Sequence, residues 1–108
     1  MQHERDEVTR LDLVQACEQI LAFTRGMTGD AFAADAKTQS AVLYQFAVIG
    51  EAVARLSDGS KAARPELPWV QIRGMRNLIV HDYGGVNPAE VWRTVEHDVP
   101  ALHVALSA

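Results

Sequence analysis

Apolar residues between positions 35 and 57 constrain the fold more than any other feature of this 108-residue chain. They recur at alternating steps of four and three, at Val42, Phe46, Ile49, Val53 and Leu56. This spacing gathers side chains along one face of an α-helix. It predicts a long helix, from about Asp35 to Ser57, that packs lengthwise against another helix.

A second amphipathic segment precedes it, and we expect a helix from about Glu4 to Arg25. Its apolar positions also follow three-four spacing, and they are Leu13, Ala16, Ile20, Phe23 and Met27. We expect Gly26 and the turn that follows to end this helix, and Phe32 to fold back onto the core. The two long helices carry more apolar surface than they can bury against each other, so we expect part of it to be buried in a homodimer interface.

The last third of the chain predicts further helices. Asn87 resembles an N-cap, with Pro88 at the first helical position and Glu90 completing a capping box. Val91, Val95 and Val99 share a face of this helix, which Pro100 is expected to kink or break. No segment shows a strand pattern. We therefore predict an all-α, four- to five-helix up-and-down bundle that forms one domain over residues 1–108.

Charge and cysteine content narrow the function. The net charge of −4 argues against indiscriminate nucleic-acid binding, yet residues 55–93 carry six basic and four acidic side chains, which suits a localised phosphate site. The single cysteine, Cys17, excludes an internal disulfide and is expected to be a buried, inert thiol in a cytoplasmic protein. No apolar run reaches the roughly 18 residues of a membrane span, and no signal peptide is evident.

The run from Arg73 to Tyr83 concentrates the chemistry. As one α-helix turning about 100° per residue, it would present a core-facing stripe of Ile72, Met75, Leu78 and Ile79. The opposite arc would carry Arg73, Arg76, Asn77, His81 and Tyr83. Arginine offers a planar donor fork to phosphate oxygens, and histidine moves protons near neutral pH. The alternative reading is a solvated helix face that ends in a glycine turn.

The wider segment supports the chemical reading. Pro68-Trp69, Met75-Arg76-Asn77, the Arg-x4-His-x-Tyr pattern from Arg76 to Tyr83 and the later Val91-Trp92 together resemble the HepT-like toxins of the HEPN superfamily. Ile49-Gly50-Glu51-Ala52 is similar to the helix ahead of the motif in that family. The resemblance extends from about Leu13 to Leu102.

This resemblance implies a metal-independent endoribonuclease toxin, without a cofactor, in which the 2′-hydroxyl of the RNA attacks the neighbouring phosphorus. Arg76 and His81 would be catalytic, and Arg73, Asn77 and Tyr83 would support them. It also implies a homodimer whose two motif helices meet in one cleft. The expected partner is a nucleotidyltransferase antitoxin of the MntA type that adds AMP to Tyr83, in a type VII-like toxin–antitoxin system.

Two other functions stay open from the sequence. One is a non-catalytic module of HEPN type that binds a nucleotide or a partner, and the other is a structural helical dimer. Glu51 could approach the motif, although a surface or capping role fits it equally. Gly50 suggests a close backbone neighbour, for which a partner subunit is one candidate. His97 and His103 lack the spacing of metal ligands on a helix and are expected on solvated faces.

Overall fold

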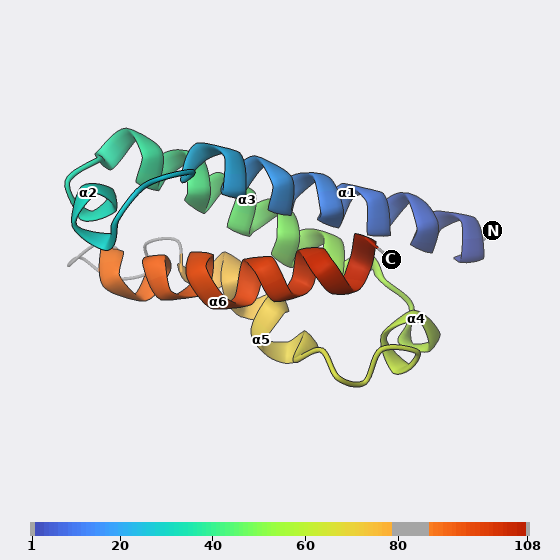
Figure 1. Ribbon diagram of the computed structural model, residues 1–108. Coiled ribbons are helices and arrows are strands. Elements are labelled where there is room, and N and C mark those ends of the chain that lie inside the picture. The colour runs from blue at the N-terminus through green and yellow to red at the C-terminus, as the bar shows by residue number, and fades with distance from the viewer. Residues whose placement is uncertain (1, 79–86, 108) are drawn as a thin grey trace.

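Three long helices form the body of the protein in a computed structural model, which describes residues 2–78 and 87–107. They are α1 (Gln2–Phe23), α3 (Ala36–Arg55) and α6 (Pro88–Ser107). Figure 1 shows α1 running antiparallel to both α3 and α6. Helix α1 packs against each of the other two. All regular structure in the described residues is helical, which confirms the predicted all-α class.

The helix starts follow from side-chain caps that the sequence predicts in part. The Asp35 carboxylate accepts a hydrogen bond from the Thr38 amide at 3.0 Å and begins α3. The Asn87 side-chain oxygen accepts from the amide of Ala89 at 3.0 Å, so the predicted cap of α6 is confirmed. After α3 the chain forms a short helix, α4 (Asp58–Ala62), capped by the Ser57 hydroxyl.

The core is the meeting place of the three apolar stripes. All five predicted seam residues of α3 are buried, from Val42 to Leu56. A second short helix, α2 (Gly29–Ala33), turns Phe32 inward until it is fully buried, with its ring centroid 5.2 Å from that of Trp92. This confirms that Phe32 folds back onto the core.

The structure differs from expectation in the exposure of Phe23 and in the absence of a break at Pro100. Phe23 is 39% exposed, because α1 ends at that residue and the chain turns away through Gly26, whose φ is +75°. Pro100 neither breaks nor ends α6, which continues to Ser107. The buried stripe of α6 runs on both sides of the proline, through Val99 and Leu102, and this packing outweighs the lost backbone hydrogen bond.

None of the helices in the described ranges has the length and apolar character needed to traverse a lipid bilayer.

Candidate functional site

The motif segment is two short helices where the sequence predicts one long one. Helix α5 (Trp69–Arg73) is a single α-helical stretch, and the 3₁₀-helix η1 (Gly74–Leu78) follows it directly. The predicted continuous α-helix from Arg73 is therefore wrong over residues 74–78, which form the 3₁₀-helix. His81 and Tyr83, which belong to the same prediction, lie outside the described residues.

The spacing of apolar residues explains the change of helix type. Ile72, Met75 and Leu78 stand three apart, and a 3₁₀-helix has three residues per turn, so side chains at that spacing align. Ile72 and Met75 are 2% and 3% exposed, and Leu78 is half-buried against the core. Gly74 favours the transition, since glycine is a weak α-helix former. The predicted stripe is confirmed for these three residues, although a different helix presents it.

Helix α3 packs against α5 and η1 at Gly50. A Cβ atom built on Gly50 would stand 2.8 Å from the carbonyl oxygen of Arg73 and 2.8 Å from the Cβ of Arg76. Such distances leave no room for any side chain, so the glycine permits backbone contact between α3 and η1. The close neighbour expected at Gly50 therefore belongs to the same chain, and no partner subunit is required there.

Arg76 is held by the residue next to this contact. Its Nη1 donates to Oε1 of Glu51 at 2.9 Å, which forms an ion pair between η1 and α3. The two side chains are 36% and 60% exposed. An exposed pair of this kind contributes only about 0–1 kcal/mol to stability. Its importance is geometric, because it directs the guanidinium along the surface of α3.

The remaining described members of the predicted site are accessible. Arg73 closes α5 and is exposed, and Asn77 in η1 is exposed as well. Trp69 anchors the start of α5, since its Nε1 donates to the carbonyl oxygens of Lys61 and Arg64 at 3.0 and 3.1 Å. The structure therefore brings Arg73, Arg76 and Asn77 onto one short segment whose underside is buried.

Sequence reasoning left the role of Glu51 undecided. The signal that identifies it is its position directly after Gly50, which lies against both the Arg73 carbonyl oxygen and the side chain of Arg76. Because η1 contacts Gly50, the side chain that follows on α3 is well placed to reach the guanidinium. Glu51 thus joins the site as a residue that contacts Arg76.

Other reactive groups in the described ranges are separate from this site. Burial raises the pKa of the Cys17 thiol to about 12, with the charge of Glu18 adding to it, so the thiol is neutral at physiological pH. This agrees with the predicted inert cysteine. His97 is exposed, and His103 contacts Glu18 at 3.2 Å between α1 and α6. Within residues 2–78 and 87–107, His, Cys, Asp and Glu side chains form no group of three that could hold a metal ion.

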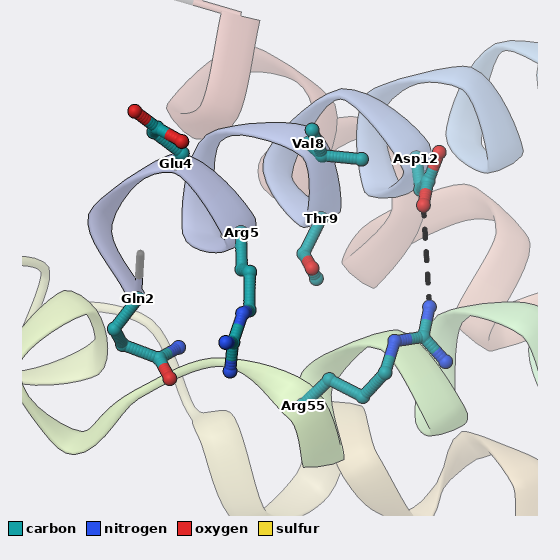
Figure 2. A pocket seen from close by; sticks show the side chains of 7 residues that line it. All are labelled: Gln2, Glu4, Arg5, Val8, Thr9, Asp12 and Arg55. Carbon is teal, nitrogen blue, oxygen red and sulfur yellow. Dashed lines mark ion pairs between the residues drawn. The ribbon is translucent and has the colours of Figure 1, made fainter.

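A surface hollow of about 620 Å³ lies elsewhere, between the start of α1 and the end of α3. Figure 2 shows its lining, with the ion pair between Asp12 and Arg55 at one end, and the two groups are 4.0 Å apart. None of the seven lining residues belongs to α5 or η1. The hollow is therefore distinct from the surface that carries Arg76.

Comparison with known proteins decides the family. The family described as ribonuclease HepT-like matches residues 13–108 of this chain. The chain belongs to the HepT-like ribonuclease family. This family match covers α5, η1 and the segment of α3 that contacts them.

Three relatives illustrate the similarity to proteins named as ribonucleases. A protein of Thermococcus cleftensis named a probable ribonuclease HepT is 38% identical over 84% of this chain and 83% of its own length. A protein of Methanocaldococcus jannaschii, named as a candidate RNase, is 37% identical over 82% of this chain and 74% of its own. A protein of Caldanaerobacter subterraneus, also named as a candidate RNase, is 31% identical over 83% of this chain and 80% of its own length. No solved structure gives a significant match.

Proposed function

We propose that this chain is an endoribonuclease toxin whose reaction is carried by Arg76 and His81. Membership of the HepT-like ribonuclease family supports the activity. The observation that carries the assignment of Arg76 is its ion pair with Glu51 on a short helix packed against α3, because this holds a guanidinium at the surface. His81 completes the Arg-x4-His pattern in the sequence.

The proposed reaction needs no metal ion. The 2′-hydroxyl of a ribose attacks the adjacent phosphorus while His81 takes the hydroxyl proton. The bond from phosphorus to the 5′-oxygen breaks, and that oxygen takes a proton from the protonated His81 and leaves as a 5′-hydroxyl. A 2′,3′-cyclic phosphate remains on the other fragment. Because RNA carries its own nucleophile, no metal-bound hydroxide has to be generated.

Arginine suits the charge that develops in this reaction. The phosphorane transition state carries more negative charge than the ground state, and a fixed guanidinium stabilises it preferentially. In this proposal Arg76 bears that charge, Arg73 adds positive potential nearby, and Asn77 orients His81 or the phosphate. Tyr83 contacts the substrate or serves as a modification site.

A comparison of RNA cleavage by wild type and the His81→Ala variant, both in EDTA, tests the activity. We expect wild type to cut RNA and the variant to lose at least about a hundredfold in rate, a typical contribution of acid–base catalysis. Equal inertness of both proteins, each shown to be folded, would contradict the proposal. It would favour the second candidate, a non-catalytic module that binds a nucleotide or a partner, for which the net charge of −4 is the supporting observation.

We further propose a homodimer in which Arg76 of one copy and His81 of the other share a cleft. The family resemblance suggests this pairing. Mixing the Arg76→Ala and His81→Ala variants tests it, because half of the reassembled dimers would then carry one intact site. We expect about a quarter of the wild-type activity to return. No recovery from variants that demonstrably exchange subunits would contradict a shared site.

The proposed regulation is AMP transfer to Tyr83 by a nucleotidyltransferase of the MntA type in the cytoplasm, as in type VII-like toxin–antitoxin systems. The added phosphate would bring negative charge to the basic motif and block RNA. Intact-mass analysis after co-expression with a nucleotidyltransferase from the neighbouring reading frame tests this. An unchanged mass, or an adduct that persists in the Tyr83→Phe variant, would refute it.

A further inference from the structure

Arg76 is fixed at both ends of its side chain. At the root, the missing side chain of Gly50 lets η1 lie directly on α3, so that any Cβ there would come within 2.8 Å of the Cβ of Arg76. At the tip, Nη1 lies 2.9 Å from Oε1 of Glu51. Both supports come from consecutive residues of the long helix α3, in which Gly50 is buried and Glu51 is exposed.

The contact between Arg76 and Glu51 also leaves the guanidinium of Arg76 able to bind a further ligand. A guanidinium presents five N–H donors in a rigid fork, and a single carboxylate oxygen at Nη1 does not engage the whole fork. Glu51 is 60% exposed, so this carboxylate lies at the rim of the surface and not beneath the arginine. The arrangement therefore constrains the direction of the guanidinium while leaving its charge at the surface.

We propose that Glu51 is a positioning residue that orients Arg76 for the phosphate of RNA. This inference rests on the endoribonuclease activity proposed above and adds a residue to its site. Glu51 makes no contact with the reacting atoms in this mechanism. It restricts Arg76 to the geometry in which its other donors meet the transition state, and misplacement of such a group by about 1 Å can lower a rate a hundredfold.

Kinetics separate this role from two simpler ones. If Glu51 were a solvated charge near RNA, its removal would reduce repulsion and lower KM while kcat stayed constant. If it competed with phosphate for Arg76, its removal would raise kcat/KM. A positioning role predicts a lower kcat with KM unchanged or reduced, because the orientation matters most in the transition state.

The test compares Glu51→Gln and Glu51→Ala by steady-state cleavage of RNA in EDTA. Glutamine can still accept a hydrogen bond from Nη1, but the bond loses its charge assistance. We expect kcat to fall about tenfold or more in the alanine variant and less in the glutamine variant. The matched control is Glu18→Gln, since Glu18 is 59% exposed and also contacts a side chain of another long helix, His103, at 3.2 Å. The control should retain wild-type kcat.

Repeating the Glu51 substitution in an Arg76 variant distinguishes an effect of Glu51 that passes through Arg76 from a direct effect of Glu51 on the reaction. In the Arg76→Lys variant, which keeps a charge but loses the planar fork, removal of Glu51 should have little further effect. A full additional loss in that background would show that Glu51 acts independently, and would overturn the proposal. So would an unchanged or increased kcat in Glu51→Ala.

A readout without catalysis keeps this inference separable from the proposed activity. In ¹⁵N spectra, the guanidinium signals of Arg76 should shift in Glu51→Gln and stay in place in Glu18→Gln. Unchanged signals in both variants would refute the positioning contact even if RNA is cleaved. Shifted Arg76 signals in a wild-type protein that cuts no RNA would instead mean that the contact exists and the proposed activity fails.

Discussion

Replacement of Gly50 by alanine is the sharpest perturbation of the candidate site, because it adds one methyl group where α3 meets η1. That methyl would stand 2.8 Å from both the carbonyl oxygen of Arg73 and the Cβ of Arg76, whereas ordinary contacts begin at 3.4 Å. The motif segment must therefore move away from α3 by about 0.6 Å or more. The side chain of Arg76 moves with it.

The effect on stability follows from two opposing contributions. Alanine is about 1 kcal/mol better than glycine inside a helix. Overpacking against backbone costs about 1–3 kcal/mol. We expect a net loss of about 0–2 kcal/mol in the free energy of unfolding, and each 1 kcal/mol corresponds to about 4 °C in Tm for a domain of this size. The displacement of Arg76 should lower the rate of RNA cleavage about tenfold or more.

Thermal unfolding followed by circular dichroism, with RNA cleavage in EDTA, measures both effects. Gly74→Ala is the matched control, since no described atom outside its own helical stretch lies within 4 Å of its added methyl and its φ of −69° suits alanine. This control should gain about 0.4–1 kcal/mol in stability. A Gly50→Ala protein that gains stability by the full helix preference of alanine and cuts RNA at the wild-type rate would refute the reasoning.

Two further predictions concern the scaffold. Cys17 should resist alkylation in the native protein at pH 8, and a Cys17→Ala variant should lose less stability than wild type as the pH rises from 9 toward 12, because the pKa of the thiol is raised from 9.0 to about 12 by folding. Equal alkaline loss of stability in the two proteins would contradict the burial effect. Asn87→Ala should lower the free energy of unfolding by about 1 kcal/mol through loss of the α6 cap, measured by urea unfolding. An unchanged midpoint would show that the cap contributes nothing.

The sequence predicts the long helices well because their apolar spacing leaves little choice. The seam from Val42 to Leu56 fits one face of a helix, and burial of that face is the main driving force of the fold. The caps at Asp35 and Asn87 are equally readable, since short polar side chains before a helix satisfy its first amides. The existence of the three long helices was therefore predictable from local chemistry alone.

The motif segment was harder to predict because two helix types fit its apolar pattern. The spacing of Ile72, Met75 and Leu78 fits an α-helix approximately and a 3₁₀-helix closely. The contact of this segment with Gly50 of α3 is a tertiary contact, which the spacing of apolar residues cannot predict. The pairing of Glu51 with Arg76 depends on that same contact. The identity of the site residues could thus be proposed from sequence, whereas the arrangement around Arg76 required the fold. The roles of His81 and Tyr83 stay predictions.

Analysis of the cleavage products in EDTA tests the proposed chemistry most directly. An RNA oligonucleotide incubated with wild type should yield fragments that end in a 2′,3′-cyclic phosphate and begin with a 5′-hydroxyl, and a 2′-deoxy substitution at the cut site should abolish that cut. The Arg76→Ala variant should form these products far more slowly. Products with a 5′-phosphate, or cleavage that persists at the 2′-deoxy position, would contradict attack by the 2′-hydroxyl of the RNA.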